Sequence, residues 1–182
     1  MTENKIINVD LEDRDKHPLV SIIVVTYNSS KFVLETLESA KSQTYQNIEL
    51  LISDDGSTDD TLQICKDWLT QNKDRFVHTE LITVEKNTGI PANCNRGIKA
   101  ANGEWITFID SDDTVNENYL SCFDNRKLGD ISMIFLGMES TRYQFNVFHT
   151  KNNRIFTLKE VIDIFDFHPH CTGVCSKIFR ND

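Results

Sequence analysis

Short apolar segments alternate with amphipathic segments along the first 110 residues, and this alternation constrains the fold more than any other feature of the chain. The apolar segments are rich in β-branched and large apolar residues, which is typical of strands buried on both faces of a parallel sheet. They are Leu19–Val25, Ile48–Ile52, a strand within Val77–Val84, and Trp105–Ile109. Strands that alternate with helices in this order predict an α/β fold, with a mostly parallel sheet flanked by helices.

The first two predicted helices begin near residues with short polar side chains, which are good helix N-caps. We expect the first helix to begin at Ser29 or Ser30 and to run to about Gln43. Its expected buried face consists of Val33, Leu37 and Ala40. We expect the second helix to begin at Ser57 or Thr58.

The third predicted helix has a proline, Pro91, in its first turn, where the missing N–H does no harm. Its apolar residues repeat with helical spacing, and we expect this stripe to be buried against the sheet. The stripe consists of Ile90, Cys94, Ile98 and Ala101. Gly103 fits the position just past the end of the helix.

After Asp113 the pattern becomes typical of a smaller mixed or antiparallel region. The expected elements are a short helix over Glu117–Phe123, strands over Ile131–Met138, Arg142–His149 and Arg154–Thr157, and a helix over Leu158–Phe167. We therefore expect one domain. It has a disordered leader over residues 1–17, an α/β half over 18–125, and the start of a second, incomplete half over 126–182.

Composition restricts the class of protein. With 39% hydrophobic and 26% charged residues the chain is globular, and no apolar run reaches the roughly 18 residues of a membrane span. The net charge of −9 argues against nucleic-acid binding. The five cysteines, without a signal-peptide pattern, indicate reduced thiols in the cytoplasm. Cys171 and Cys175 lie near His168 and His170, but their spacing differs from that of zinc ligand pairs, so we expect free thiols.

Polar residues follow the end of each predicted strand. The four loops are Thr26–Asn28, Asp54–Gly56, Asn87–Gly89 and Asp110–Asp112. In a parallel α/β sheet the ligand site lies beyond the carboxyl ends of the strands. Topology would therefore bring these four loops to one rim, although they are far apart in sequence.

The last of these loops carries three carboxylates in four positions, at Asp110, Asp112 and Asp113. Like charges repel, so a fold that places them together favours a compensating cation, and oxygen ligands suit magnesium or manganese. Such a cation at the end of a buried strand indicates chemistry on a phosphate-bearing substrate. The alternative is a helix N-cap or a solvated turn, because aspartate-rich turns are common.

The polar loops and their strands together resemble the family 2 glycosyltransferases. The matching segments, in order, are Val20–Asn28, Asp54–Asp59, Asn87-x-Gly89 with Asn95 and Gly97, and Gly103–Asp113. The resemblance implies a GT-A fold and inverting transfer of a sugar from a nucleotide-diphosphate sugar to an acceptor hydroxyl. The acceptor would be a saccharide or glycolipid of a surface polysaccharide pathway. An acceptor at the inner face of the membrane, with loose peripheral association, stays open.

The resemblance also implies roles for individual residues. Thr26, Tyr27 and Asn28 would line the nucleotide pocket, although Tyr27 fits a packed aromatic equally well. Asp55 would accept a hydrogen bond from the base, often uracil, which suits an ionised carboxylate; the alternative is a turn-forming residue that caps a helix. Asp54 is expected to be structural.

For the other end of the donor, Asp110 would lie near the ribose or a metal-bound water, and Asp112 would ligate the manganese or magnesium that holds the diphosphate. Asp113 would support the loop. Asn93 and Ser111 complete the expected nucleotide-sugar site.

Two positions depart from the family pattern. An arginine common in the family is replaced by Cys94, so its role is lost or moves to Arg96 or Asn93. No Glu-Asp pair follows Asp113 to act as the general base. The available acids, Asp163, Asp166 and Asp182, have no matching context. We therefore expect the base beyond Asp182, and a chain that binds donor but turns over poorly.

Two other functions remain open. Asp110-Ser-Asp112-Asp113-Thr114 fits the motif of haloacid dehalogenase-type phosphohydrolases, but that motif normally ends the first core strand and a later acidic motif is missing. A nucleotide-sugar-binding domain without catalysis would also keep Asp112 and lack the base. The sequence argues against a simple dinucleotide-binding domain, because no Gly-x-Gly-x-x-Gly follows the first strand.

Overall fold

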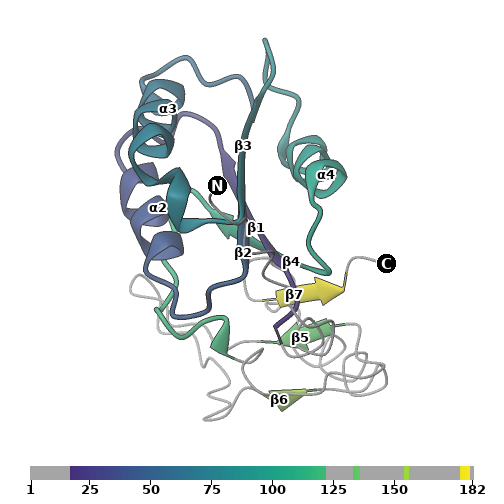
Figure 1. The fold of residues 1–182 in the computed structure, drawn as a ribbon. Helices are drawn as coiled ribbons and strands as arrows, with labels where there is room; N and C mark the ends of the chain where they lie inside the picture. The colour runs from purple at the N-terminus through teal and green to yellow at the C-terminus, as the bar shows by residue number, and fades with distance from the viewer. Residues whose placement is uncertain (1–16, 122–132, 136–153, 156–176, 181–182) are drawn as a thin grey trace, which may run out of the picture.

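The computed structural model describes residues 17–121, 133–135, 154–155 and 177–180, coloured in Figure 1. Its elements are β1 (Val20–Thr26), α2 (Val33–Lys41), β2 (Ile48–Asp54), α3 (Thr61–Asn72), η1 (Lys73–Arg75), β3 (His78–Thr83), α4 (Ile90–Ala100), β4 (Trp105–Asp110), β5 (Met133–Phe135), β6 (Arg154–Ile155) and β7 (Lys177–Arg180). The predicted strand over 142–149, the predicted helix over 158–167, and Cys171 and Cys175 lie outside the described residues, as does nearly all of the predicted leader.

The strands form one sheet in the order β3-β2-β1-β4-β7-β5-β6. The first four are parallel, whereas β7 joins β4 antiparallel and continues the sheet to β5. The register aligns the carboxyl ends, because Thr26 lies opposite Asp54, Asp54 opposite Thr83, and Val25 opposite Asp110. The expected α/β fold with a mostly parallel sheet is confirmed.

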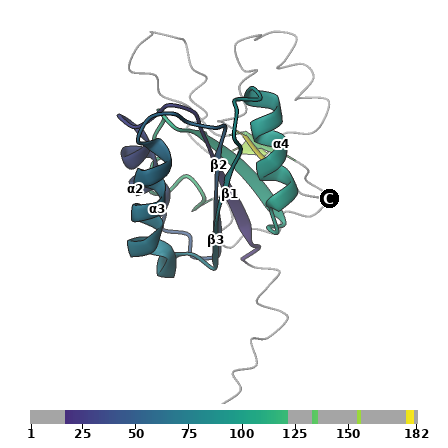
Figure 2. The same cartoon turned by 90° about the horizontal axis from the view of Figure 1, so that it is seen from above.

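Helices cover both faces of the parallel strands. Helices α2 and α3 lie on one face and α4 on the other, which Figure 2 shows from above. The larger core lies under α2 and α3, around Val24, Leu37 and Trp105. The smaller core under α4 contains Ile23, Leu51 and Phe108. Each face of the sheet therefore has its own hydrophobic layer, as the apolar strand segments predict.

The predicted buried stripe of α4 is correct for Cys94 and Ala101, which pack against the smaller core, but wrong for its two isoleucines. Ile90 is 73% exposed and Ile98 39% exposed, whereas the buried residues of the helix are Asn93 and Gly97. A Cβ atom at Gly97 would lie only 2.4 Å from Cγ2 of Ile23. The helix thus contacts the sheet through its smallest residue, and close backbone approach decides which face is buried.

The predicted starts of the first two helices are also wrong. Helix α2 begins at Val33, and although the carbonyl of Ser29 accepts the Phe32 and Val33 N–H groups, no side chain caps the helix. Helix α3 begins at Thr61 because Ser57 and Thr58 are bound elsewhere in the site. These short polar side chains connect loops instead of capping helices.

At the amino ends of the parallel strands, close packing against β1 requires a glycine at position 103. A Cβ atom there would lie 2.5 Å from Oγ of Ser21. The Ser21 hydroxyl donates to Glu49, which is fully buried and also accepts two hydrogen bonds from Asn102. This network joins the turn after α4 to β1 and β2.

The predicted helix over Glu117–Phe123 is not formed in its described part, which ends at residue 121. Its N–H groups instead close turns, with Tyr119 donating to Asn116 and Ser121 to Asn118. Within the described ranges, no helix is long and apolar enough to cross a membrane.

Candidate functional site

The loops that follow β1, β2, β3 and β4 contact one another at the carboxyl edge of the sheet, as topology predicts. The Asp55 N–H donates to the Thr26 carbonyl at 2.9 Å, and the Ser111 N–H donates to the Val25 carbonyl at 3.2 Å. The Thr88 N–H donates to the Asp55 carboxylate at 2.9 Å. The polar residues at this edge therefore form one connected site.

Asp54 is the structural centre of the site, as expected. Its carboxylate is completely buried and accepts hydrogen bonds from groups on three loops. The donors are the hydroxyls of Thr26, Ser57 and Thr83 and the N–H groups of Gly56 and Ser57. Gly56 has φ +75°, a left-handed conformation that favours glycine, and it also packs against the backbone of Lys86. Asp54 thus joins the ends of β1, β2 and β3.

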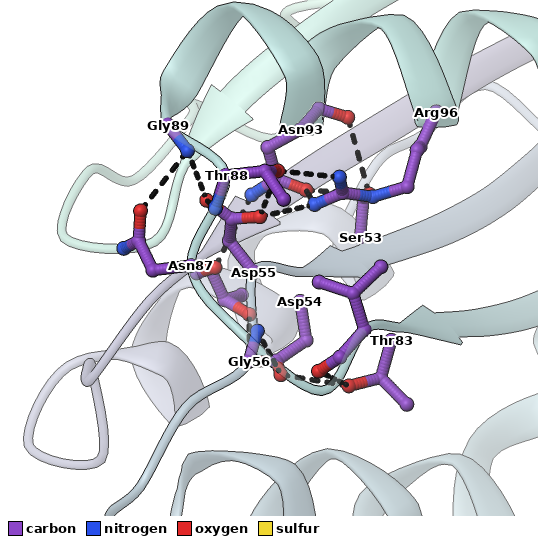
Figure 3. A network of polar contacts seen from close by, with 12 residues as sticks. Ser53, Asp54, Asp55, Gly56, Thr83, Asn87, Thr88, Gly89, Asn93 and Arg96 are labelled. Carbon is purple, nitrogen blue, oxygen red and sulfur yellow. Dashed lines mark hydrogen bonds and ion pairs between the residues drawn. The ribbon is translucent and has the colours of Figure 1, made fainter.

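Asp55 faces the opposite way from Asp54 and is bound just as completely (Figure 3). One oxygen accepts from the Thr88 hydroxyl at 2.7 Å and from Arg96, and the other from the N–H groups of Thr88 and Gly89 at 2.9 and 2.7 Å. Burial raises the pKa of Asp55, but these hydrogen bonds outweigh it and lower the pKa below its usual value. A carboxylate has about four lone-pair sites, so its acceptor capacity is filled by the protein.

Arg96 provides the positive charge of this network. Its guanidinium pairs with Asp55 and also donates to Thr88 Oγ1 at 2.7 Å and to Asn93 Oδ1 at 3.1 Å. Cys94, at the position of the common family arginine, is half-buried, and burial together with the charge of Asp110 raises the pKa of its thiol. The guanidinium at this edge therefore comes from Arg96, two residues further along α4.

Thr26 and Asn93 are buried beneath the surface of the site. Both are buried, at 1% and 4% exposure. The Asn93 amide donates to the Thr26 carbonyl at 3.2 Å and accepts from the Ser53 hydroxyl at 2.6 Å. Asn93 thereby fixes α4 to the ends of β1 and β2.

Tyr27 and Asn28 form the exposed part of the loop after β1. Tyr27 is 44% exposed, so it is not the packed aromatic that the alternative reading requires. Asn28 has φ +50°, which asparagine tolerates better than most residues. Its Oδ1 accepts the Thr58 N–H at 2.8 Å, and its own N–H donates to the Ser57 hydroxyl at 2.9 Å. The loops after β1 and β2 therefore hold each other.

The acidic loop after β4 directs its side chains in two directions. Asp110 is half-buried and Asp112 and Asp113 are exposed, whereas Ser111 is buried and contacts the hydroxyl of Ser29. Although Asp113 is exposed as a residue, partial desolvation of its carboxyl group raises its pKa, and the charges of Asp110 and Asp112 raise it further. The three carboxylates are thus close enough for their negative charges to interact, as the motif predicts.

No complete metal site is built from protein side chains in the part of the chain that the structure describes. There, no group of three or more histidine, cysteine, aspartate or glutamate residues is arranged to hold a metal ion. Magnesium in proteins is commonly bound by one or two carboxylates, with substrate phosphates and water as the other ligands. The carboxylates expected for this role are those of Asp110, which is half-buried, and Asp112, which is exposed.

Sequence reasoning did not predict several residues of the site. The Asn87–Gly89 loop was predicted, but Thr88 was not singled out within it, and the hydroxyls of Ser29 and Ser53 were not predicted. Each of the three binds a predicted residue. The available signal was the buried carboxylate of Asp55, which requires donors from neighbouring loops.

Comparison with known proteins shows similarity to one family. The model of "Glycosyl transferase family 2" matches residues 21–181. The glycosyltransferase GlyG of Streptococcus pneumoniae is 44% identical over 104 residues, which cover 56% of this chain and 33% of GlyG. WfaP of Escherichia coli, a UDP-Glc:α-D-GlcNAc-diphosphoundecaprenol β-1,3-glucosyltransferase, is 43% identical over 97 residues, which cover 52% of this chain and 36% of WfaP.

A solved structure is also similar. TarS 1–349 of S. aureus in complex with UDP-GlcNAc superposes with a TM-score of 0.69 at 28% identity, over 90% of this chain and 45% of TarS. The chain therefore spans about a third of the two curated relatives and about half of this structure.

Proposed function

The chain belongs to glycosyl transferase family 2, and on that premise we propose that it binds a nucleotide-diphosphate sugar, with uridine as the nucleoside, and transfers the sugar with inversion to an acceptor hydroxyl. The observation that carries the proposal is the connected carboxyl edge. It combines the exposed Tyr27–Asn28 loop with the half-buried Asp110 and the exposed Asp112. WfaP, by its name, and TarS, in its solved complex, both use or bind a UDP sugar, which supports the choice of uridine.

In this proposal the loop after β1 binds the base of the donor, and the acidic loop after β4 binds its diphosphate. Tyr27 and Asn28 are available to contact the base, while Asp55 holds the Asn87–Gly89 loop beside them. Asp110 and Asp112 would hold manganese or magnesium, which stabilises the negative charge that develops on the diphosphate as the sugar leaves. Among the described residues, the chain thus offers a nucleotide site and a diphosphate site on one edge.

The transfer step requires a group that accepts a proton. An acceptor hydroxyl attacks the anomeric carbon, the bond to the diphosphate breaks, and a carboxylate takes the hydroxyl proton. No Glu-Asp pair follows Asp113 in the sequence, so we assign no residue to this role. Residues 126–182 would begin the acceptor half, which β7 and β5 join directly to β4.

The setting that we infer is assembly of a surface polysaccharide or glycolipid in the cytoplasm, next to the inner face of the membrane. WfaP, whose named acceptor is a lipid-linked sugar, supports an acceptor of this kind. Membership of glycosyl transferase family 2 argues against the phosphohydrolase alternative. Its motif should end the first core strand, whereas here the acids follow β4, after three strand–helix units.

The test measures thermal stability with UDP, GDP, dTDP and CMP, each with and without manganese. A ligand that binds only the folded chain must raise its melting temperature. We expect a manganese-dependent rise with UDP that is lost in Asp112→Asn. The matched control is Asp74→Asn, which removes the same charge from an exposed residue after α3, and it should keep the rise.

A rise with UDP that is independent of manganese and retained in Asp112→Asn would refute the role of the acidic loop. No rise with any nucleotide would refute donor binding by this chain. A UDP-sugar transfer assay then separates a transferase from a domain that only binds, because we expect binding without efficient turnover.

A further inference from the structure

Two buried hydroxyls connect the loop after β1 to the acidic loop after β4. The Oγ atoms of Ser29 and Ser111 lie 2.5 Å apart, across 82 residues of sequence. Both residues are nearly inaccessible, at 9% and 7% exposure. Ser111 belongs to the expected nucleotide-sugar site, whereas the sequence did not predict that Ser29 would contact it.

Counting protons gives the contact a direction. A serine hydroxyl has one proton to donate. With the Ser29 hydroxyl donating to the Tyr27 carbonyl at 3.1 Å, its oxygen is left to accept from the Ser111 hydroxyl. The chain of donors therefore runs from Ser111 through Ser29 to the backbone of Tyr27. The Ser111 proton is used inside the protein and is not available to a ligand.

The Ser29 end of this relay is held firmly by the start of α3. The Ser29 N–H donates to Oγ1 of Thr61 at 2.7 Å, and that hydroxyl donates to Asp59 at 2.5 Å. The second oxygen of Asp59 accepts the Ser30 N–H at 3.1 Å. Because Ser29 is anchored in this way, its hydrogen bond with Ser111 restrains the acidic loop, and the position of Ser29 does not depend on that loop.

We propose that the Ser111–Ser29–Tyr27 relay positions the acidic loop relative to the Tyr27–Asn28 loop, so that the base and diphosphate ends of the donor site keep a fixed separation. This inference rests on the proposed function. It makes Ser29 and Ser111 positioning residues, and it replaces the expected direct contact of the Ser111 hydroxyl with the donor.

The test begins without any ligand and uses amide hydrogen exchange by NMR. In Ser29→Ala, the amides of Ser111 and Asp113 should exchange about fivefold faster, the factor expected for one buried hydrogen bond. In Ser111→Ala, the Ser29 amide should respond by a similar factor. The double variant should exchange no faster than either single variant, because both remove the same bond.

The matched control is Thr107→Val. It removes a buried hydroxyl of β4 that bonds with Tyr119 at 2.8 Å and does not join the two loops. Exchange at Ser29 and Ser111 should be unchanged in this variant. Exchange rates that stay constant across the loops in both serine variants, or that change equally in the control, would overturn the relay.

Calorimetric titration with manganese and UDP then tests the positioning role. Each serine variant should weaken UDP binding about fivefold, and the double variant no more than that. If the serine variants change the amide exchange rates but bind UDP as tightly as the unmodified chain, the proposal that the relay positions the donor site is overturned. If the unmodified chain does not bind UDP, the proposed function fails, and the exchange data alone decide whether the relay exists.

Discussion

Gly97→Ala should destabilise the chain, although alanine is the better helix former. Gly97 lies on the buried face of α4, where a Cβ atom would be 2.4 Å from Cγ2 and 3.3 Å from Cδ1 of Ile23. Carbon atoms prefer separations of about 3.5–4.0 Å, so the helix or the strand must move by about 1 Å. Ile23 is fully buried in β1, a central strand held between β2 and β4, and has little room to yield.

The magnitude follows from two opposing terms. Overpacking of this kind costs about 1–3 kcal/mol, and the helix propensity of alanine offsets about 1 kcal/mol. The net loss should be about 1–2 kcal/mol, which lowers Tm by about 2–8 °C in a chain of this size. The helix also carries Asn93 and Arg96, so its displacement should loosen the contact between Arg96 and Asp55.

The assay is urea denaturation followed by circular dichroism. In an Ile23→Ala background, which removes the clashing methyl group, Gly97→Ala should lose its cost, giving a coupling of about 1 kcal/mol or more. Asn95→Ala is the matched control, because Asn95 is exposed on the same helix and should be neutral or slightly stabilising. A Gly97→Ala chain as stable as the unmodified one, or strict additivity in the cycle, would refute the packing argument.

Three further predictions concern stability and thiol chemistry. Arg75→Lys should lower the free energy of unfolding by about 1–3 kcal/mol in urea, because Arg75 donates to backbone carbonyls of four residues, which a single ammonium cannot span; an unchanged midpoint would contradict this. Burial raises the pKa of Asp59, but hydrogen bonds from Thr61 and Ser30 lower it to about 2, so its contribution should be present above pH 4 and lost as the pH falls toward 2. Because Asp59 is exposed, screening limits this contribution to about 1 kcal/mol or less, measured as the pH-dependent difference from Asp59→Asn. Burial and the charge of Asp54 raise the pKa of Cys65 to about 12, so mass spectrometry should find Cys94 alkylated before Cys65 in the folded chain at pH 8, and equal labelling would contradict the burial of Cys65.

Sequence patterns predicted most of the site because its position depends on topology. The strands β1, β2 and β4 begin and end within a residue or two of their apolar segments, since β-branched runs of this length favour only a buried strand. Once those strands are parallel, their carboxyl ends must lie at one edge. The convergence of Thr26, Asp55 and Asp110 therefore follows from residue order alone.

Helix starts and buried faces were predicted less well, because several arrangements were locally equivalent. Ser29 and Ser57 could cap helices, yet their hydroxyls bind Ser111 and Asp54, which only the fold brings near. Periodicity placed Ile90 and Ile98 on the buried face of α4, but the space against Ile23 admits only a glycine there.

The sequence by itself determined the α/β topology and the convergence of four polar loops at the carboxyl ends of the strands, because strand composition and chain order leave few alternatives. Only the tertiary structure decided how those residues are used. It filled the acceptor sites of Asp55 with Thr88, Gly89 and Arg96, and it turned the Ser111 hydroxyl inward. The physical reason is that a hydrogen bond depends on distance and direction between groups far apart in the chain, and neither is encoded in local sequence.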